Sequence, residues 1–380
     1  GDRSAAVVFY FGEISYNLHI VFQGGEKLKS YFIEMLTDQP RRTAVLRNTV
    51  KNKRTVATLF WAREYGVLKW LGSNTRLTVN EFEQWLVQMR QAGLIKINGQ
   101  TAWLTPSGIA EKEKFLKTHY QPRLGNWSWL ARPDQLAPRV LLATQAVSQY
   151  AHRQKHYVPL NLAPAELYFV RQWFYGNRNR IVDDWSAELQ QAAAALAKMD
   201  ERLAKLLVFS LPGYQTTGWT IDQAAQALKI SVDEVMIMER DVWLGIGYLA
   251  ASQPAGLLRS LLYDHLHDTP LNHSATITLR MFEQGLSLEQ ISQRRRLRLG
   301  TIREHILEAA IFMPEALPLD RLLTPAQIDR LAAQYHGKPA TWEFLPPILE
   351  PQSPADKLQN EQSFFEYRLF QIIKGGEHNG

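Results

Sequence analysis

The sequence predicts a mainly α-helical protein of several domains, interrupted by one small β-hairpin. Apolar residues recur every three or four positions through most long segments, and Gly, Pro, Ser or Thr stands at the breaks between them. This is the pattern of amphipathic helices joined by loops. A chain of 380 residues exceeds what one core usually organises, and a hydrophobic fraction of 46% is sufficient for several packed cores.

The composition narrows the class of protein. The chain has no cysteine, which excludes disulfides, thiolate metal sites and cysteine nucleophiles and indicates a reducing, cytoplasmic location. No run approaches the roughly 18 apolar residues of a membrane helix, and the first residues lack the features of a signal peptide. The formal net charge of +6 favours polyanionic partners, provided that the positive charge is concentrated.

Residues 31–118 predict a winged-helix-like domain, whereas residues 1–30 stay unassigned. Three helical stretches come first, at 42–52, 55–70 and 78–92, and Thr78 and Glu81 form a predicted capping box on the third. Asn98-Gly99 then lies between two alternating runs, which predicts a type I′ hairpin turn. Another helix opens at Thr105-Pro106. Helices followed by a two-stranded wing and a further helix resemble a winged-helix domain.

The middle of the chain predicts two further helical segments. Residues 119–215 form a helical connector domain with clear helices at 163–173 and 185–207. Residues 216–268 form a small helix-turn-helix-like unit, with helices at 221–228 and 232–243. Because the second of these helices carries several acids and Arg240 as its one base, we favour a structural or interaction role for this unit over DNA contact.

Residues 269–338 predict a helix-turn-helix domain. A first helix begins near Ser274 and stops at Gly285, and Ser287 with Gln290 forms a capping box on the second helix. The third helix opens at Gly300-Thr301, with Ile302, Ile306 and Leu307 as its core face. Residues 339–380 follow as a Pro-rich linker and a C-terminal apolar helix, which either folds back on the core or docks a partner.

The turn before the third helix carries the first candidate DNA-binding site. Four arginines, Arg294, Arg295, Arg296 and Arg298, lie where a phosphate backbone would run. At the exposed start of the third helix, Thr301, Arg303 and His305 are expected to reach base edges in the major groove. The alternatives stay open, because arginine runs are usually solvated surface and many helix-turn-helix units bind only proteins.

A second basic stretch lies near the N-terminal end of the winged-helix-like domain. Its candidate phosphate contacts are Arg42, Lys51, Lys53 and Arg54, in a stretch without an intervening acid. The helix before the wing carries Glu81 and Glu83, so protein docking competes with DNA contact here.

The segment from Gly285 to Ile306 also has a family resemblance. Its Gly-Leu-Ser-Leu-Glu-Gln-Ile-Ser start and Thr-Ile-x-x-His-Ile end resemble the helix-turn-helix domain appended to RecQ-type DNA helicases. The same domain closes the YpbB-like proteins of Gram-positive bacteria, and Asn-Lys-Arg-Thr-x-x-Thr-Leu-Phe-Trp-Ala at 52–62 fits that family too. Ser292 departs from the family pattern, in which a small alanine is usual. The resemblance implies work beside a RecQ-family helicase.

Features of an enzyme are missing from the sequence. Residues 24–30 have glycines and a lysine without Walker A spacing, and His265 and His267 would point to different helix faces. We therefore expect no catalysis, cofactor, metal, small-molecule substrate or membrane partner. The favoured function is a DNA-binding accessory protein that works with a RecQ-family helicase in replication, recombination or repair, nucleoid-associated when bound to DNA. The alternatives are a sequence-specific transcriptional regulator with two DNA-binding modules and a protein-interaction scaffold without DNA contact.

Overall fold

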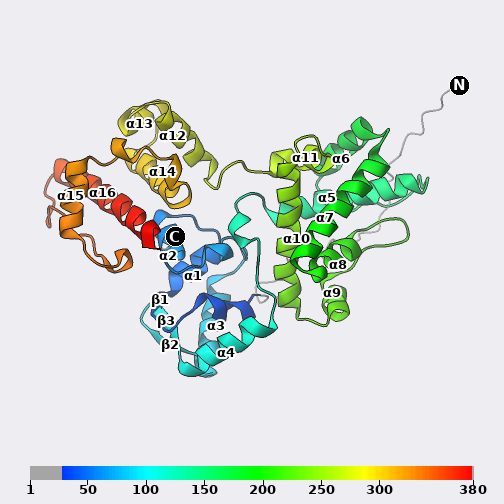
Figure 1. The fold of residues 1–380 in the computed structure, drawn as a ribbon, viewed down its shortest axis with the longest axis horizontal. Helices are drawn as coiled ribbons and strands as arrows, with labels where there is room; N and C mark the ends of the chain where they lie inside the picture. Colours follow the sequence, from blue (N-terminus) through cyan, green and yellow to red (C-terminus); the bar gives the residue numbers. More distant parts are fainter. Residues whose placement is uncertain (1–27, 379–380) are drawn as a thin grey trace. The chain divides into compact units, whose positions relative to one another are not determined.

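The computed structural model describes residues 28–378, and the chain divides into two compact units (Figure 1). Unit 1 comprises residues 1–40 and 73–268, and unit 2 comprises residues 41–72 and 269–380. Helices dominate both units, so the expected mainly α-helical fold class is confirmed. Among the described helices, none combines the length and the apolar character needed to cross a membrane.

Unit 1 contains a hairpin with its flanking helices and a larger bundle of helices. Its α-helices and strands are α3 (Val79–Gln91), β2 (Ile95–Asn98), β3 (Thr101–Leu104), α4 (Pro106–Thr118), α5 (Pro133–Ala151), α6 (Pro164–Asn177), α7 (Ile181–Met199), α8 (Glu201–Ser210), α9 (Ile221–Leu228), α10 (Val232–Ser252) and α11 (Leu257–Leu262). Short 3-10 helices are η1 (Ser30–Met35), η3 (Gly125–Trp127) and η4 (Tyr263–His265).

The hairpin forms where the sequence predicts it, with a different turn. Asn98 pairs with Thr101 in the antiparallel ladder, so Gly99 and Gln100 occupy the centre of the turn instead of Asn98 and Gly99. Gly99 has a φ of +55°, while Asn98 and Gln100 are not in the left-handed region. Positive φ at the first central position alone fits a type II′ turn, so the expected type I′ turn is wrong.

Helix caps set the boundaries of the surrounding helices. The predicted capping box of Thr78 and Glu81 is present on α3, and Thr105 accepts a hydrogen bond from the Gly108 N–H at the start of α4. The stretch expected as one helix at 185–207 is two helices. Asp200 has extended backbone and accepts from the Arg202 N–H, which ends α7 and begins α8.

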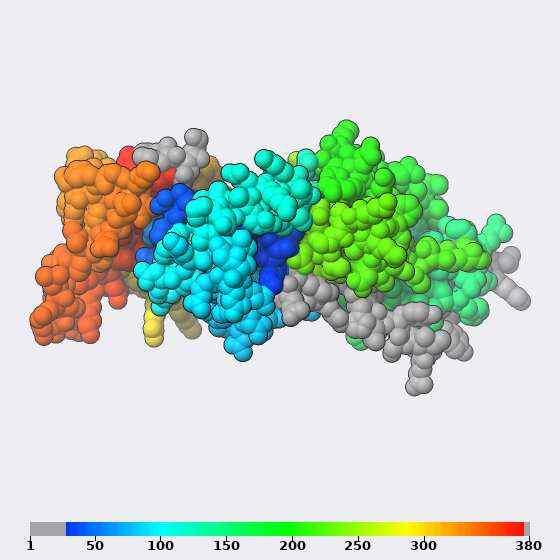
Figure 2. Space-filling model, turned by 90° about the horizontal axis from the view of Figure 1, so that it is seen from below, coloured from blue at the N-terminus to red at the C-terminus, as the bar shows by residue number. Residues whose placement is uncertain are grey.

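Helix α10 is the central helix of the bundle. It contacts α5, α7, α8, α9 and α11, and its middle is buried on all sides, including Glu239, Arg240 and Asp241. In Figure 2 the light-green surface of the region around α9 and α10 adjoins the green surface of the other bundle helices. The burial of its middle on every side suits a structural role for this helix, the role favoured from the sequence.

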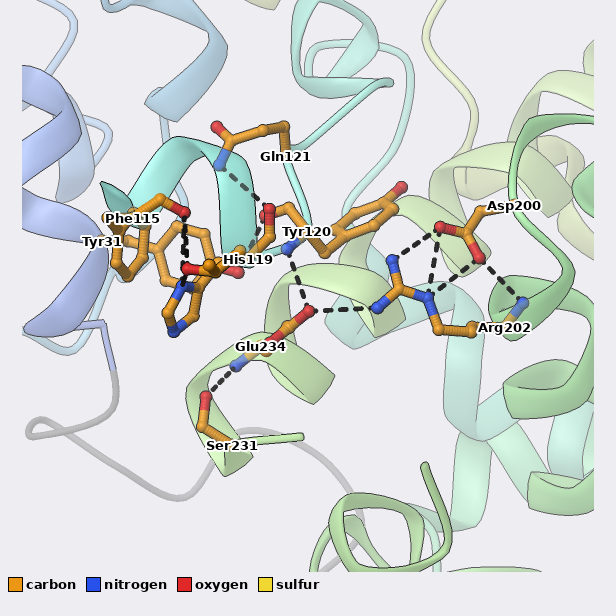
Figure 3. A network of polar contacts seen from close by, with 10 residues as sticks. Tyr31, Phe115, His119, Tyr120, Gln121, Asp200, Arg202, Ser231 and Glu234 are labelled. Atoms are coloured by element: carbon orange, nitrogen blue, oxygen red, sulfur yellow. Dashed lines mark hydrogen bonds and ion pairs between the residues drawn. The ribbon is translucent and has the colours of Figure 1, made fainter. Parts of the chain in front are cut away.

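Two carboxylates of α10 fix the chain that leaves α4, and Figure 3 shows the first of them, Glu234, between Tyr120 and Arg202. Glu234 accepts from the Tyr120 N–H at 2.9 Å and from the Arg202 guanidinium at 3.2 Å. Asp241 accepts from the Tyr120 hydroxyl at 2.7 Å and from the Arg123 N–H at 2.6 Å. Because Asp241 is fully buried, its pKa is raised by desolvation although these donors oppose the rise. The hairpin segment and the bundle are thereby joined within unit 1.

Unit 2 brings together two parts of the chain that lie far apart in sequence. Its α-helices and strand are β1 (Arg41–Arg42), α1 (Thr43–Val50), α2 (Val56–Glu64), α12 (His273–Glu283), α13 (Leu288–Arg295), α14 (Leu299–Phe312), α15 (Pro325–Gln334) and α16 (Pro354–His378). Its 3-10 helices are η2 (Leu68–Trp70), η5 (Pro314–Ala316), η6 (Leu319–Arg321) and η7 (Pro339–Thr341). The stretches expected at 42–52 and 55–70 therefore belong to this unit, and the second ends at Glu64 before η2.

Helix α14 lies at the centre of unit 2. It contacts α2, α12, α13 and α16 (Figure 1), and Ile302 and Ile306 on its predicted core face are fully buried. The apolar C-terminal helix α16 folds back on this core, where Phe365, Leu369 and Phe370 are buried beside α14 and α2 residues. Of the two roles expected for this helix, packing on the core or docking a partner, the structure shows packing on the core.

Candidate nucleic-acid interface

All the residues predicted to contact DNA belong to unit 2, which also holds the excess positive charge of the chain. Unit 2 contains 20 Lys and Arg against 14 Asp and Glu, whereas unit 1 contains 23 of each. Within unit 2, residues 41–72 have eight Lys and Arg and a single acid, Glu64. The formal net charge of +6 is therefore concentrated, which is the condition for electrostatic binding of a polyanion.

The helix-turn-helix is built by local signals in its sequence. The Asn272 side chain caps α12 by accepting from the Ala275 N–H at 2.9 Å, and Gly285, with a φ of +98°, turns the chain after it. Ser287 and Gln290 form the predicted capping box on α13. Ile291 is fully buried against α14, so the two short helices share one core.

The turn between α13 and α14 is closed by its own backbone and by Ser292. Arg296 is the C-cap of α13 and adopts the left-handed region with a φ of +53°. The Leu297 N–H donates to the Ser292 carbonyl at 3.1 Å, and the Ser292 hydroxyl donates back to the Leu297 carbonyl at 2.6 Å. The Ser292 side chain thus supplies a hydrogen bond that an alanine at this position would lack.

Three of the four turn arginines face solvent. Arg294, Arg296 and Arg298 are exposed, and within the described residues none of them has an ion pair. We call these three the arginine turn. Arg295 differs, because its guanidinium donates to the Ser274 carbonyl at 2.7 Å and to the Thr278 hydroxyl. It holds α13 against α12, so its guanidinium is already engaged.

Two residues expected on the outer face of α14 are buried, and that expectation is wrong. Arg303 is 6% exposed because α16 covers it; its guanidinium donates to Gln362 and lies 5.9 Å from the Phe365 ring. Burial lowers the pKa of Arg303 below the usual arginine value. His305 is 8% exposed, and its Nδ1 lies 2.8 Å from the Thr278 hydroxyl of α12. Neither side chain faces solvent in this packing.

The remaining outer positions of α14 offer little for reading bases. Thr301 is partly exposed in the first turn, and Glu304 is exposed one residue after Arg303. A carboxylate at this position opposes a phosphate backbone nearby. Around the start of α14 the exposed positive charge therefore lies in the arginine turn, and Arg280 of α12 is a further exposed cation of the motif.

The second basic stretch is divided between structural and exposed positions. Arg54 donates to Glu308 at 2.6 Å and also to the Pro270 carbonyl, so it is a structural contact inside unit 2. Lys53 is exposed and Lys51 is partly exposed. Arg42 is exposed with its guanidinium 4.7 Å from the Trp61 ring centroid, a cation–π contact that leaves its edge available to solvent.

Sequence reasoning missed Glu308, which organises this unit. Its carboxylate, 3% exposed, accepts from Arg54, from the Asn272 N–H at 3.1 Å and from the Asn272 side-chain amide at 2.6 Å. It thereby ties the basic stretch, the start of α12 and the middle of α14 together. The sequence did contain a signal, because Glu308 is a single acid inside the apolar run Ile306–Ile311. An acid in such a run is expected to be buried, and a buried charge needs hydrogen-bond or charged partners.

The burial of His305 predicts a pH dependence of stability. Desolvation, followed by the Arg295 charge, lowers the pKa of His305 below its ordinary value of 6.5. Below pH 6.5 the histidine of the unfolded chain binds a proton, whereas the buried histidine of the folded state stays neutral. The contribution of His305 to the free energy of unfolding is therefore fully present above pH 6.5 and is lost as the pH falls. For a histidine that stays neutral in the folded state, the free energy of unfolding falls by at most about 1 kcal/mol between pH 6.5 and 5.5.

Urea unfolding of the wild type and of His305→Gln, followed by circular dichroism at pH 7.5 and 5.5, measures this difference. We expect the free energy of unfolding to fall more steeply with acidification in the wild type than in His305→Gln. His336→Gln, at an exposed histidine of the same unit, is the control and should follow the wild type. Equal pH slopes for wild type and His305→Gln would contradict the buried, neutral state of His305.

Comparisons with known proteins also identify a helix-turn-helix domain in this part of the chain. A family model described as a helix-turn-helix domain matches residues 274–371, from the start of α12 into α16. Protein YpbB of Bacillus subtilis (strain 168) is 24% identical over 334 residues, which cover 84% of this chain and 89% of YpbB. No solved structure matches the chain significantly. The resemblance expected from the sequence is confirmed: the chain is similar to YpbB over most of its length and carries a helix-turn-helix domain in unit 2.

Proposed function

We propose that unit 2 binds DNA chiefly through its phosphates, and that the arginine turn makes the principal contact. The observation that carries this proposal is the contrast between Arg294, Arg296 and Arg298, which are exposed, and Arg303 and His305, which are buried. Phosphate contacts give affinity without sequence information, whereas base-edge contacts from a third helix give sequence preference. The protein therefore binds DNA with little sequence preference.

The position of the arginine turn favours a phosphate ligand. Arg298 is the N-cap residue of α14, and the helix that it opens has 14 residues. The first backbone N–H groups of such a helix point out of its end and attract an anion. Arginine forks placed beside that end match phosphate geometry. Exposed Lys53 and Arg42 add positive charge elsewhere on the same unit.

Replacing the arginine turn with alanine tests this proposal. For Arg294→Ala/Arg296→Ala/Arg298→Ala we expect weaker binding to a duplex and a shallower dependence of log K on log salt. The slope should fall in magnitude by about 0.9 for each phosphate contact removed. Fluorescence anisotropy with two unrelated duplexes of 20 base pairs, titrated across a salt series, measures both quantities.

The matched control removes the same charge from exposed positions of unit 1. Arg90→Ala/Lys114→Ala/Lys117→Ala also deletes three positive charges, so it separates a local contact from a change in net charge. We expect its salt slope to match the wild type. An unchanged slope for the arginine-turn variant, or an equal loss in both triple variants, would contradict the assignment.

We further propose that the protein acts as an accessory factor for a RecQ-family DNA helicase. The support is the resemblance of the helix-turn-helix to the domain appended to such helicases, together with a sequence that has no Walker A motif of its own. A protein without a motor contributes by binding DNA or by docking the enzyme that unwinds it. Replication, recombination and repair are the processes in which such a partner works.

Unwinding assays with the RecQ-family helicase of the same genome test the accessory role. We expect the intact protein to raise the fraction of a forked duplex that a limiting amount of helicase unwinds. The arginine-turn variant should lose this stimulation, while the unit 1 control variant keeps it. If neither unwinding nor the sedimentation of the helicase changes when the protein is added, the accessory role fails and DNA binding alone remains.

A further inference from the structure

The outer face of α6 in unit 1 carries tyrosines and arginines in alternation. Tyr168, Arg171, Tyr175 and Arg178 follow each other at helical spacings of three, four and three residues, which places them on one face. Tyr168 is 65% exposed and Arg171 is exposed, while Tyr175 and Arg178 are partly exposed. At about 1.5 Å per residue, the two tyrosines are separated by about 10 Å along the helix, with Arg171 between them.

The opposite face of α6 fixes this orientation. Val170, Trp173 and Phe174 are buried in unit 1, and the Trp173 indole N–H donates to the Ser260 hydroxyl of α11 at 3.0 Å. The Trp173 ring also packs against Trp185 of α7, with ring centroids 5.2 Å apart. A helix held by three large apolar side chains cannot rotate its tyrosine–arginine face into the core without exposing them.

The loop after α5 extends the positive charge beside this face. Arg178 lies over the Tyr150 ring at 5.5 Å, and Tyr150 packs on Phe174, so the end of α5 meets the end of α6. Arg153 and Lys155 follow directly and are exposed. Residues 150–180 contain a single acid, Glu166, whose carboxylate is bound by Arg139 at 2.6 Å. This surface is basic although unit 1 as a whole is charge-balanced.

We propose that the face of α6 and the adjoining loop bind single-stranded DNA. Unpaired bases offer flat rings that stack on an exposed tyrosine such as Tyr168, and the phosphates between them pair with arginine and lysine. A duplex keeps its bases stacked inside the helix. Its phosphates would contact the arginines and lysines, but its bases would not stack on the tyrosines. Interleaved rings and cations thus favour a single strand over a duplex.

This inference goes beyond the arginine turn, because it rests on other residues in the other unit. The two sites differ in the ligand that they prefer, since the arginine turn needs phosphates alone and the α6 face needs unpaired bases. A protein with both would hold the single strand and the duplex of a fork. Either site can fail in experiment without the other failing.

Binding of the full chain to a fluorescein-labelled dT oligonucleotide of 20 residues tests the α6 site, with a duplex of 20 base pairs as reference. For Tyr168→Ala we expect a loss of about tenfold or more in dT affinity, the usual effect of removing one stacked ring, and duplex affinity within about twofold. Tyr168→Trp should restore dT binding. Arg171→Ala should reduce the salt slope for dT by about 0.7.

Tyr248→Ala is the matched control, because Tyr248 is a 50% exposed tyrosine of the same unit on α10. We expect it to bind dT as the wild type does. The proposal is overturned if Tyr168→Ala leaves dT affinity unchanged, if it weakens dT and duplex equally, or if Tyr168→Trp fails to restore binding. Duplex binding that is insensitive to the arginine turn would refute the proposed function, while the Tyr168 comparison would still decide this site.

Discussion

The buried carboxylate of Glu308 is the contact on which the rest of unit 2 depends. It lies on α14 and accepts hydrogen bonds from Arg54 and Asn272, which come from parts of the chain more than 200 residues apart. Burying a carboxylate is costly unless charged and polar donors surround it. Removing Arg54 would leave the buried carboxylate without its cationic partner. The need of the buried Glu308 carboxylate for the Arg54 guanidinium therefore holds segment 41–72 against the helix-turn-helix.

This arrangement places α14 inside the unit instead of at its surface. Helix α2 packs on it, and α16 folds back onto it; Arg63 of α2 donates to the Ile372 carbonyl at 2.7 Å, and Arg368 of α16 lies 4.8 Å from the Phe60 ring. A third helix covered in this way presents few side chains to a groove. Under the proposed function, affinity for DNA comes from the ends and turns of the motif. The arginine turn is the part of the motif where three positive charges close together in sequence stay in solvent.

The sequence predicted those features that depend on neighbouring residues. The capping boxes at Thr78 and Ser287 and the turn after Gly285 follow from local hydrogen bonding and backbone preference. The hairpin was found because its flanking runs alternate, yet its turn was displaced by one residue, since the pairing of Asn98 with Thr101 fixes the register.

Features that depend on distant contacts could not be predicted. Arg303 was expected outside because helical spacing places it off the core face, but α16, some 60 residues later, covers it. The break at Asp200 has a different cause, because the Asp200–Arg202 pairing that interrupts the Ala- and Leu-rich stretch is local. From the sequence, α6 was assigned to a helical connector domain. The tyrosine–arginine face of α6 can be identified as outward-facing only once the residues on its buried side are known.

The most direct test of the central claim, that unit 2 holds phosphates and does not read sequence, is selection of bound duplexes from a random pool. The account predicts that protein-bound and unbound fractions, sequenced after equilibration at moderate salt, differ by less than about tenfold for any short sequence, because base contacts of about 1–3 kcal/mol each are lacking. Enrichment of one defined site by a thousandfold or more would contradict it. Such a result would show that α14 reads bases after all.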